Sequence, residues 1–131
     1  ARPADQGFID EPGSDAVEAL CAEAGALGLS VLCVPEVVSA LARRLREGLL
    51  TARQFGAAKR RVLDDVRDAD IVQLTPDVVG SALQVLEASP VRALDALQVA
   101  SALQWNADLF ASGDTRQLAA AQRAGLHTRR V

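Results

Sequence analysis

The chain has 131 residues and a formal net charge of -3 at pH 7. Half of its residues are hydrophobic and 24% are charged, a balance that predicts a folded protein rather than a disordered one. Runs of apolar residues stay well short of the roughly 20 residues that span a bilayer, and the chain does not open on a basic and apolar secretion leader. We therefore expect one domain with one hydrophobic core, outside the membrane.

The cysteines and the single histidine argue against a disulfide framework and against a zinc site. Cys21 and Cys33 lack CxxC spacing and fall in apolar segments, which favours two buried, reduced thiols and a cytoplasmic location. His127 has no Cys or His near it in the sequence. A zinc site built from nitrogen and sulfur ligands is therefore not expected.

The first third of the chain is predicted to hold one helix and one strand. Residues 1–13 are irregular, because prolines and glycines interrupt any regular pattern. Ser14 is the predicted N-cap of a helix that ends where Gly25 and Gly28 stand. Residues 29–34 form an apolar run typical of a strand that is buried on both faces.

A helical hairpin is predicted to follow. Pro35 opens a helix that ends at Gly48, and Thr51 caps a second helix that runs to about Asp68. Several apolar side chains near the turn either belong to the core or form an exposed face for a partner. These residues are Leu49, Leu50 and Phe55.

The rest of the chain alternates strands and helices. The predicted elements are a strand at 71–74, a helix from Thr75 to Ala88, a helix over 91–105, a strand at 109–112, a helix from Asp114 to Gly125, and an edge strand at 126–131. This alternation predicts an α/β fold in which helices cover both faces of a parallel sheet.

Three acidic residues occur at the starts of predicted helices. Glu36 follows Pro35, Asp95 lies early in its helix, and Asp114 stands where a strand gives way to a helix. Acids there complement the helix macrodipole, and Asp114 is a possible N-cap that Gln117 would complete as a capping box. A parallel sheet, however, brings such junctions to one edge, and crowded carboxylates favour Mg²⁺ or Mn²⁺.

Nearly all the positive charge is arginine, which suits bidentate contacts to phosphate. The alternative is an ordinary solvated helix face with acidic partners such as Asp64 and Asp65. The clusters are Arg43, Arg44 and Arg46, and then Arg53, Lys59, Arg60 and Arg61.

Four blocks of sequence carry a resemblance to a known family. They are Phe8-Ile-Asp-Glu-Pro-Gly-Ser14, Val34-Pro-Glu36-Val-Val-Ser-Ala-Leu41, Arg92-Ala-Leu-Asp95-Ala-Leu-Gln-Val-Ala-Ser-Ala-Leu103 and Ala111-Ser-Gly-Asp114-Thr-Arg-Gln-Leu118. From about Phe8 to the C-terminus the chain resembles the PIN-domain nucleases, in particular the VapC-type toxins of VapBC toxin–antitoxin pairs. The last two blocks, in this order and at this spacing, are the most specific.

The resemblance implies a three-layer α/β/α PIN-like fold and an endoribonuclease that depends on Mg²⁺ or Mn²⁺. By position, Glu36, Asp95 and Asp114 match the family's second, third and fourth catalytic, metal-binding acids. Ser112 matches a Ser or Thr that often precedes the fourth acid, and the family often has His where Gln98 stands. The resemblance further implies an RNA substrate, an antitoxin protein as partner and a homodimer.

The family's first acid has no counterpart in this alignment. With Phe8 matched to an aromatic residue that follows the first strand, the acid falls just before Ala1, and Asp5 lies too close to Phe8 to replace it. We therefore expect residues 1–131 to form a single PIN-like domain whose first central strand is missing and lies in an upstream segment of the natural protein. Loss of a central strand would leave buried backbone groups unpaired, at about 1–3 kcal/mol each.

In the leading hypothesis the acids hold the metal and nearby arginines neutralise charge on the scissile phosphate. The candidate RNA-binding residues are Arg43, Arg44, Arg92 and Arg116. A missing acid would instead favour a catalytically degenerate PIN-like module that acts through protein–protein association. A third hypothesis is a plain α/β domain whose acids only cap helices.

Overall fold

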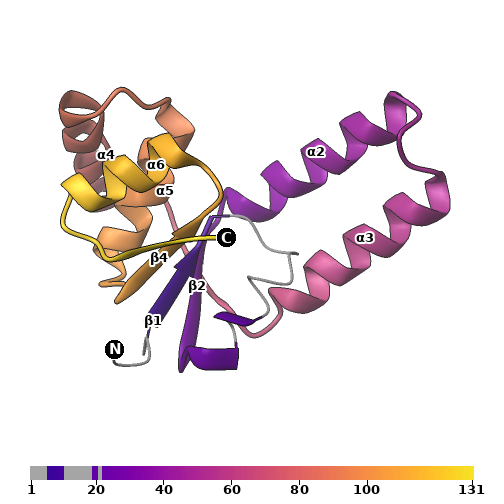
Figure 1. Ribbon diagram of the computed structural model, residues 1–131, viewed down its shortest axis with the longest axis horizontal. Coiled ribbons are helices and arrows are strands. Elements are labelled where there is room, and N and C mark those ends of the chain that lie inside the picture. Colours follow the sequence, from indigo (N-terminus) through magenta and orange to yellow (C-terminus); the bar gives the residue numbers. More distant parts are fainter. Residues whose placement is uncertain (1–5, 11–18, 21) are drawn as a thin grey trace.

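The computed structural model describes residues 6–10, 19–20 and 22–131 (Figure 1). The predicted N-cap at Ser14 and the position of Cys21 lie outside the described residues. The predicted first helix is described only at residues 19–20 and 22–23, which are helical. No helix in the described part of the chain is long and apolar enough to cross a membrane.

The described strands form one parallel sheet, as the alternation of elements predicts. The strands are β1 (Gln6–Ile9), β2 (Ala26–Ser30), β3 (Asp70–Val72), β4 (Leu109–Ser112) and β5 (Thr128–Arg130), in the order β3-β2-β1-β4-β5. Every pair of neighbours is parallel. The α/β fold and the edge position of the last strand are therefore confirmed.

The prediction that the first central strand is missing was wrong. Strand β1 lies in the middle of the sheet, between β2 and β4. It escaped notice because it has only four residues and contains Gly7, which is a poor strand former. Phe8, which the alignment put after the strand, lies inside it and pairs with Gly28 on one side and Phe110 on the other.

The sheet separates two clusters of buried residues, because side chains of a strand alternate between its faces. Phe8 and Phe110 lie in one cluster with residues of the helices α4 (Pro76–Ala88), α5 (Ala93–Gln104) and α6 (Thr115–Arg123). Ile9 and its neighbours lie in the other, with Leu20 and the end of the α3 region. Core packing on both faces therefore holds β1 in place.

The boundary between β2 and the next helix differs from the prediction. Residues 29–34 were expected to be the strand, whereas β2 ends at Ser30 and helix α2 (Cys33–Arg46) already contains Cys33. Gly28 does not end a helix but lies inside β2, where an added Cβ would sit 2.8 Å from the Trp105 ring. The glycine therefore marks a close approach between strand and ring rather than a helix stop.

Helices α2 and α3 (Ala52–Asp65) form the predicted hairpin, which extends away from the sheet (Figure 1). Gly48, at φ 75°, turns the chain after α2, and Thr51 forms a full capping box with Gln54 at the start of α3. Leu49 is 69% exposed at the turn, and Leu50 and Phe55 are partly exposed. These three side chains therefore lie outside the buried core.

Candidate metal centre

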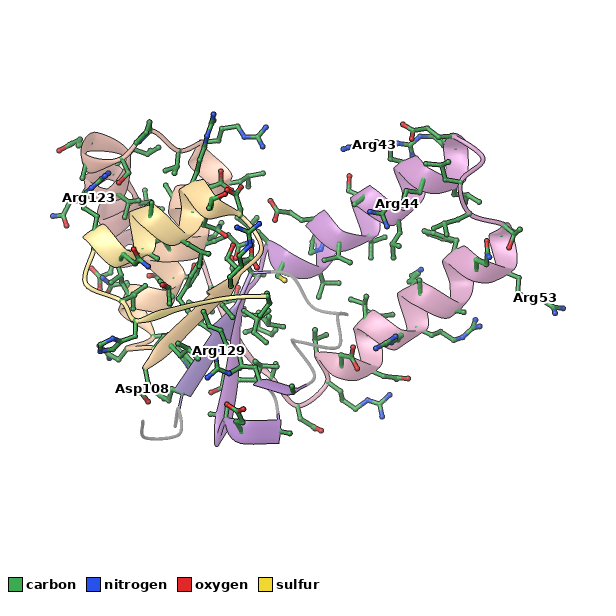
Figure 2. The ribbon with its side chains drawn as sticks, viewed as in Figure 1. Arg43, Arg44, Arg53, Asp108, Arg123 and Arg129 are labelled. Carbon is green, nitrogen blue, oxygen red and sulfur yellow. The ribbon has the colours of Figure 1, made fainter. Side chains whose placement is uncertain are left out.

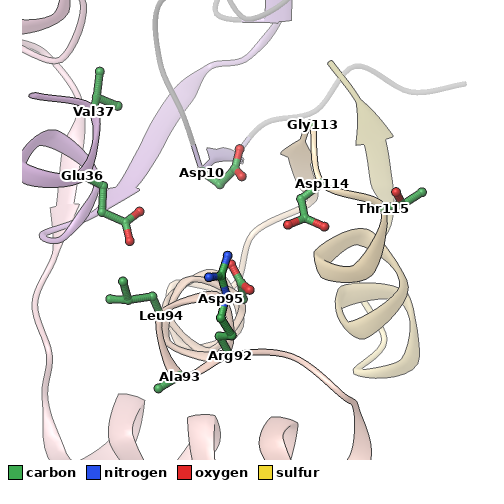
Figure 3. A pocket seen from close by; sticks show the side chains of 10 residues that line it. All are labelled: Asp10, Glu36, Val37, Arg92, Ala93, Leu94, Asp95, Gly113, Asp114 and Thr115. Atoms are coloured by element: carbon green, nitrogen blue, oxygen red, sulfur yellow. The ribbon is translucent and has the colours of Figure 1, made fainter. Parts of the chain in front are cut away.

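A cavity of about 910 Å³ opens at the carboxyl ends of β1 and β4 (Figure 3). Four carboxylates line it and point into the same space: Asp10, Glu36, Asp95 and Asp114. The other lining residues are Val37, Arg92, Ala93, Leu94, Gly113 and Thr115. The structure thus brings the three acids predicted from the sequence together and adds a fourth, Asp10.

Asp10 directly follows β1, and the parallel pairing of β1 with β4 sets its position. Its backbone N–H donates to the carbonyl of Ala111 at 3.2 Å, and its Oδ2 accepts a hydrogen bond from the hydroxyl of Ser112 at 2.9 Å. The Cys33 thiol donates to the Asp10 carbonyl at 3.0 Å. The first strand is thus followed by an acid within residues 1–131. Matching Phe8 to a residue after that strand had placed this acid before Ala1.

Asp114 is the N-cap of α6, as the capping pattern predicts. Its Oδ1 accepts from the backbone N–H groups of Arg116 at 2.9 Å and Gln117 at 3.4 Å. The predicted capping box does not form, because the side chain of Gln117 contacts Ser112 and the N–H of Asp114 donates to the Ser112 hydroxyl at 3.0 Å. Capping and a place in the cavity are therefore compatible roles for one carboxylate.

Glu36 lies in the first turn of α2 and has a buried amide as a partner. Nε2 of Gln98, a residue only 2% exposed, donates to Glu36 Oε2 at 3.1 Å. The buried Oε1 atom of Gln98 accepts no hydrogen bond from the residues that the structure describes. From the sequence, Gln98 stood out only because the family often has His at this position. Both side chains can offer an N–H donor there.

The N-terminal ends of three helices meet at the cavity. Glu36 and Asp95 lie in the first turns of α2 and α5, and Asp114 caps α6. Each macrodipole stabilises a nearby negative charge by roughly 0.3–1 kcal/mol. Arg92, the exposed N-cap residue of α5, lines the same cavity as Asp95 (Figure 3) and adds a positive group to the lining.

A family model described as the PIN domain matches residues 7–123. The chain belongs to the PIN-domain family. The match begins within β1 and ends with the last residue of α6, so it includes Asp10 and the other three acids of the cavity. No curated protein matches the chain.

Solved structures with this PIN fold cover almost the whole chain. VapBC2 from Rickettsia felis, bound to a DNA fragment from its promoter, has a TM-score of 0.65 at 10% identity, over 96% of this chain and 98% of that one. VapC20 from Mycobacterium tuberculosis, a sarcin-ricin loop cleaving toxin, has a TM-score of 0.61 at 17% identity, over 92% and 95%. VapBC-5 from the same organism, of a toxin–antitoxin family, scores 0.63 at 15% identity, over 97% and 98%. At these identities the likeness shows the fold.

The donor set of this PIN domain suits a hard divalent cation. Carboxylate oxygens are the ligands that Mg²⁺ and Mn²⁺ prefer, and Mg²⁺ keeps several waters and needs only one or two carboxylates. Among the described residues no three acidic, His or Cys side chains stand close enough to enclose an ion. An ion in this open cavity would therefore keep several of its waters, as Mg²⁺ commonly does.

The predicted RNA-binding arginines lie at different distances from this site. Arg92 lines the cavity, and Arg116 is exposed in the first turn of α6. Arg43 and Arg44 lie near the far end of α2, on the projecting hairpin (Figure 2). The structure therefore brings Arg92 to the acids and leaves Arg43 and Arg44 remote from them.

Proposed function

We propose that this PIN domain is an endoribonuclease that depends on Mg²⁺ or Mn²⁺ and serves as the toxin of a cytoplasmic toxin–antitoxin pair. The observation that carries the proposal is the convergence of four carboxylates on one open cavity, from the end of β1 and the N-terminal ends of α2, α5 and α6. Asp10, Glu36, Asp95 and Asp114 would hold the ion. When bound, it supplies charge neutralisation at the phosphodiester and a lowered pKa for an attacking water.

The residues of the chain contribute binding and orientation to this hydrolysis. The guanidinium of Arg92 has the fork geometry that pairs with phosphate oxygens, and it lies on the rim beside Asp95. Helix N-termini favour an anion between the carboxylates once a cation balances their charge. Arg116, Arg43 and Arg44 are proposed to contact the RNA backbone farther from the scissile bond.

The hairpin is proposed to bind the antitoxin. Helices α2 and α3 are both amphipathic, and apolar side chains on them are only partly buried. An exposed apolar surface of this kind can pack against the apolar face of a partner helix. The partly exposed residues include Val38, Leu41, Leu45, Phe55 and Ala58. The named fold relatives that come from toxin–antitoxin families support this partner, and a homodimer is proposed with it.

Cleavage of RNA by matched variants tests the proposal. Asp95→Asn should abolish Mg²⁺-dependent cleavage of a mixed cellular RNA substrate while the variant stays folded by circular dichroism. Asp77→Asn is the matched control, because Asp77 lies in the first turn of α4 and does not line the cavity. Undiminished cleavage by Asp95→Asn would contradict the proposal.

A catalytically degenerate module was the alternative, and its main support was a missing first acid. Asp10 directly follows the central strand β1 and lines the cavity. The absence of a first acid therefore no longer supports the degenerate module. Capped helices alone also explain the acids poorly, since capping gives no reason for Asp10 to face the cavity.

A further inference from the structure

A buried chain of side chains lies behind Asp10. Gln117, in the first turn of α6, is 2% exposed, and Ser112 at the end of β4 is fully buried. The Ser112 hydroxyl oxygen lies 2.7 Å from Oε1 of Gln117 and 2.9 Å from Oδ2 of Asp10. It also accepts the backbone N–H of Asp114 at 3.0 Å. One hydroxyl therefore joins Gln117 to two acids of the cavity.

A count of hydrogens fixes the direction of this chain. A serine hydroxyl has one hydrogen to donate and two lone pairs to accept with. The N–H of Asp114 takes one lone pair, and an ionised Asp10 takes the hydrogen, because a carboxylate only accepts. Gln117 must then donate to the remaining lone pair. For this, the amide must be turned by about 180°, so that Nε2 rather than Oε1 faces Ser112; amide oxygen and nitrogen are assigned from such hydrogen-bond patterns.

The position of Gln117 gives a second reason to assign it a role. Three residues after the Asp114 N-cap, a glutamine would normally fold back to the N-cap N–H as a capping box. Here the Ser112 hydroxyl occupies that N–H, so Gln117 contributes no such cap. Its amide is nonetheless buried, which costs free energy unless a hydrogen bond compensates. The hydrogen bond that compensates is the one that faces Ser112.

We infer that Gln117 is a positioning residue, which acts through Ser112 to orient the Asp10 carboxylate for a divalent cation. The inference rests on the proposed function of the cavity as a metal site. Gln117 is not one of the residues that line the cavity. Its effect is to tie Asp10, which follows β1, to the start of the helix that carries Asp114.

Calorimetric titration of the whole protein with Mn²⁺ at fixed pH tests this inference. Gln117→Met keeps the length of the side chain but removes the donor, and should weaken Mn²⁺ binding at least about 10-fold, as partners of metal ligands typically do. Gln122→Met is the matched control, since Gln122 on the same helix donates to the Thr128 hydroxyl at 2.7 Å outside the site. This control should bind Mn²⁺ like the wild type.

A double-mutant cycle shows whether Gln117 acts through Ser112. In a Ser112→Ala background, Gln117→Met should cause no further loss of Mn²⁺ affinity. Equal affinity of Gln117→Met and wild type, or an undiminished additional loss in the Ser112→Ala background, would overturn the inference while leaving the metal site standing. A wild type that binds no Mn²⁺ would overturn the proposed function and the inference with it.

A second variant covers the case in which Gln117→Met does not fold, which circular dichroism in EDTA would reveal. Gln117→Asn keeps the amide but withdraws it by one methylene, and should lower Mn²⁺ affinity in the same direction. Wild-type affinity in Gln117→Asn would count against the inference.

Discussion

The contact between Gln98 and Glu36 combines a gain and a cost in one buried side chain. The amide donates to a carboxylate, which is worth about 1.5–3 kcal/mol, while its buried Oε1 forgoes a hydrogen bond at about 1–3 kcal/mol. Stability alone therefore gives little reason for a glutamine at this position. Its hydrogen bond to Glu36 gives a better reason, because it orients that carboxylate toward the cavity.

We predict that Gln98→Met separates these two effects. The substitution removes the hydrogen bond to Glu36, but it also removes the buried Oε1 that accepts no hydrogen bond. These effects nearly cancel, so the free energy of unfolding should change by less than about 1.5 kcal/mol. Mn²⁺ affinity should fall about 10-fold, because Glu36 loses an orienting donor. Urea denaturation and calorimetry measure the two quantities, with Gln104→Met on the exposed face of α5 as the control. A loss of stability without a loss of affinity would contradict the prediction.

Single residues were predicted unevenly from the sequence. Glu36, Asp95 and Asp114 were found because each stands at a helix start, where local patterns are strong. Asp10 was missed because its strand has four residues and its meaning depends on pairing with Leu109–Ser112, about 100 positions away. An apolar pair followed by an acid, Phe8-Ile9-Asp10, was the available signal.

Among the elements, β2 depends on an unusually close approach. Gly28 pairs with Phe8 and lies under the Trp105 ring, and Phe8 stacks on Phe110 with ring centroids 5.8 Å apart. The aromatic cluster thereby connects β2, β1, β4 and the end of α5. Through Phe8, this cluster includes one face of β1, the strand that Asp10 directly follows.

Two glycine-to-alanine substitutions should have opposite effects on stability. Gly28→Ala should destabilise the fold by about 1–3 kcal/mol, because its Cβ would collide with the Trp105 ring at 2.8 Å. Gly80→Ala, in α4 where an added Cβ meets nothing within 4 Å, should stabilise it by up to about 1 kcal/mol. Thermal unfolding of both variants checks this, and a neutral Gly28→Ala would contradict the packing described.

The capping box at the start of α3 should contribute to the stability of the hairpin. Thr51→Ala removes the side chain that accepts from Gln54 N–H at 3.1 Å, and should cost about 1 kcal/mol of unfolding free energy. Because Thr51 is the N-cap of α3 and does not line the cavity, Mn²⁺ affinity should not change. A change in affinity would show that the hairpin and the site are coupled.

Helices were predicted better than strands for a physical reason. Thr51 and Thr75 cap their helices as their side chains predict, since capping acts over three residues. Strand β1, with four residues and a glycine, has no such local signal, because its partners are distant in the sequence. The boundary of β2 was therefore displaced by several residues, and β1 was overlooked.

In the whole molecule, Arg43 and Arg44 lie on the projecting hairpin (Figure 2) and do not line the cavity of the four acids. The double variant Arg43→Glu, Arg44→Glu should leave Mn²⁺ affinity unchanged. It should weaken binding of single-stranded RNA and reduce the slope of log K against log salt, since each lost phosphate contact removes about 0.7 from that slope. Fluorescence anisotropy at several salt concentrations measures this. An unchanged slope would exclude these two arginines from the RNA path.

The central claim is that four carboxylates, Asp10 among them, form a divalent-metal site. Calorimetric Mn²⁺ titration of wild type, Asp10→Asn and Asp108→Asn tests it most directly. Asp108 is the matched control, because its Oδ2 accepts the Gln6 N–H at 2.9 Å at the opposite end of the same strand pair. Wild type and Asp108→Asn should bind Mn²⁺, and a folded Asp10→Asn should not. Equal binding by Asp10→Asn and wild type would contradict it.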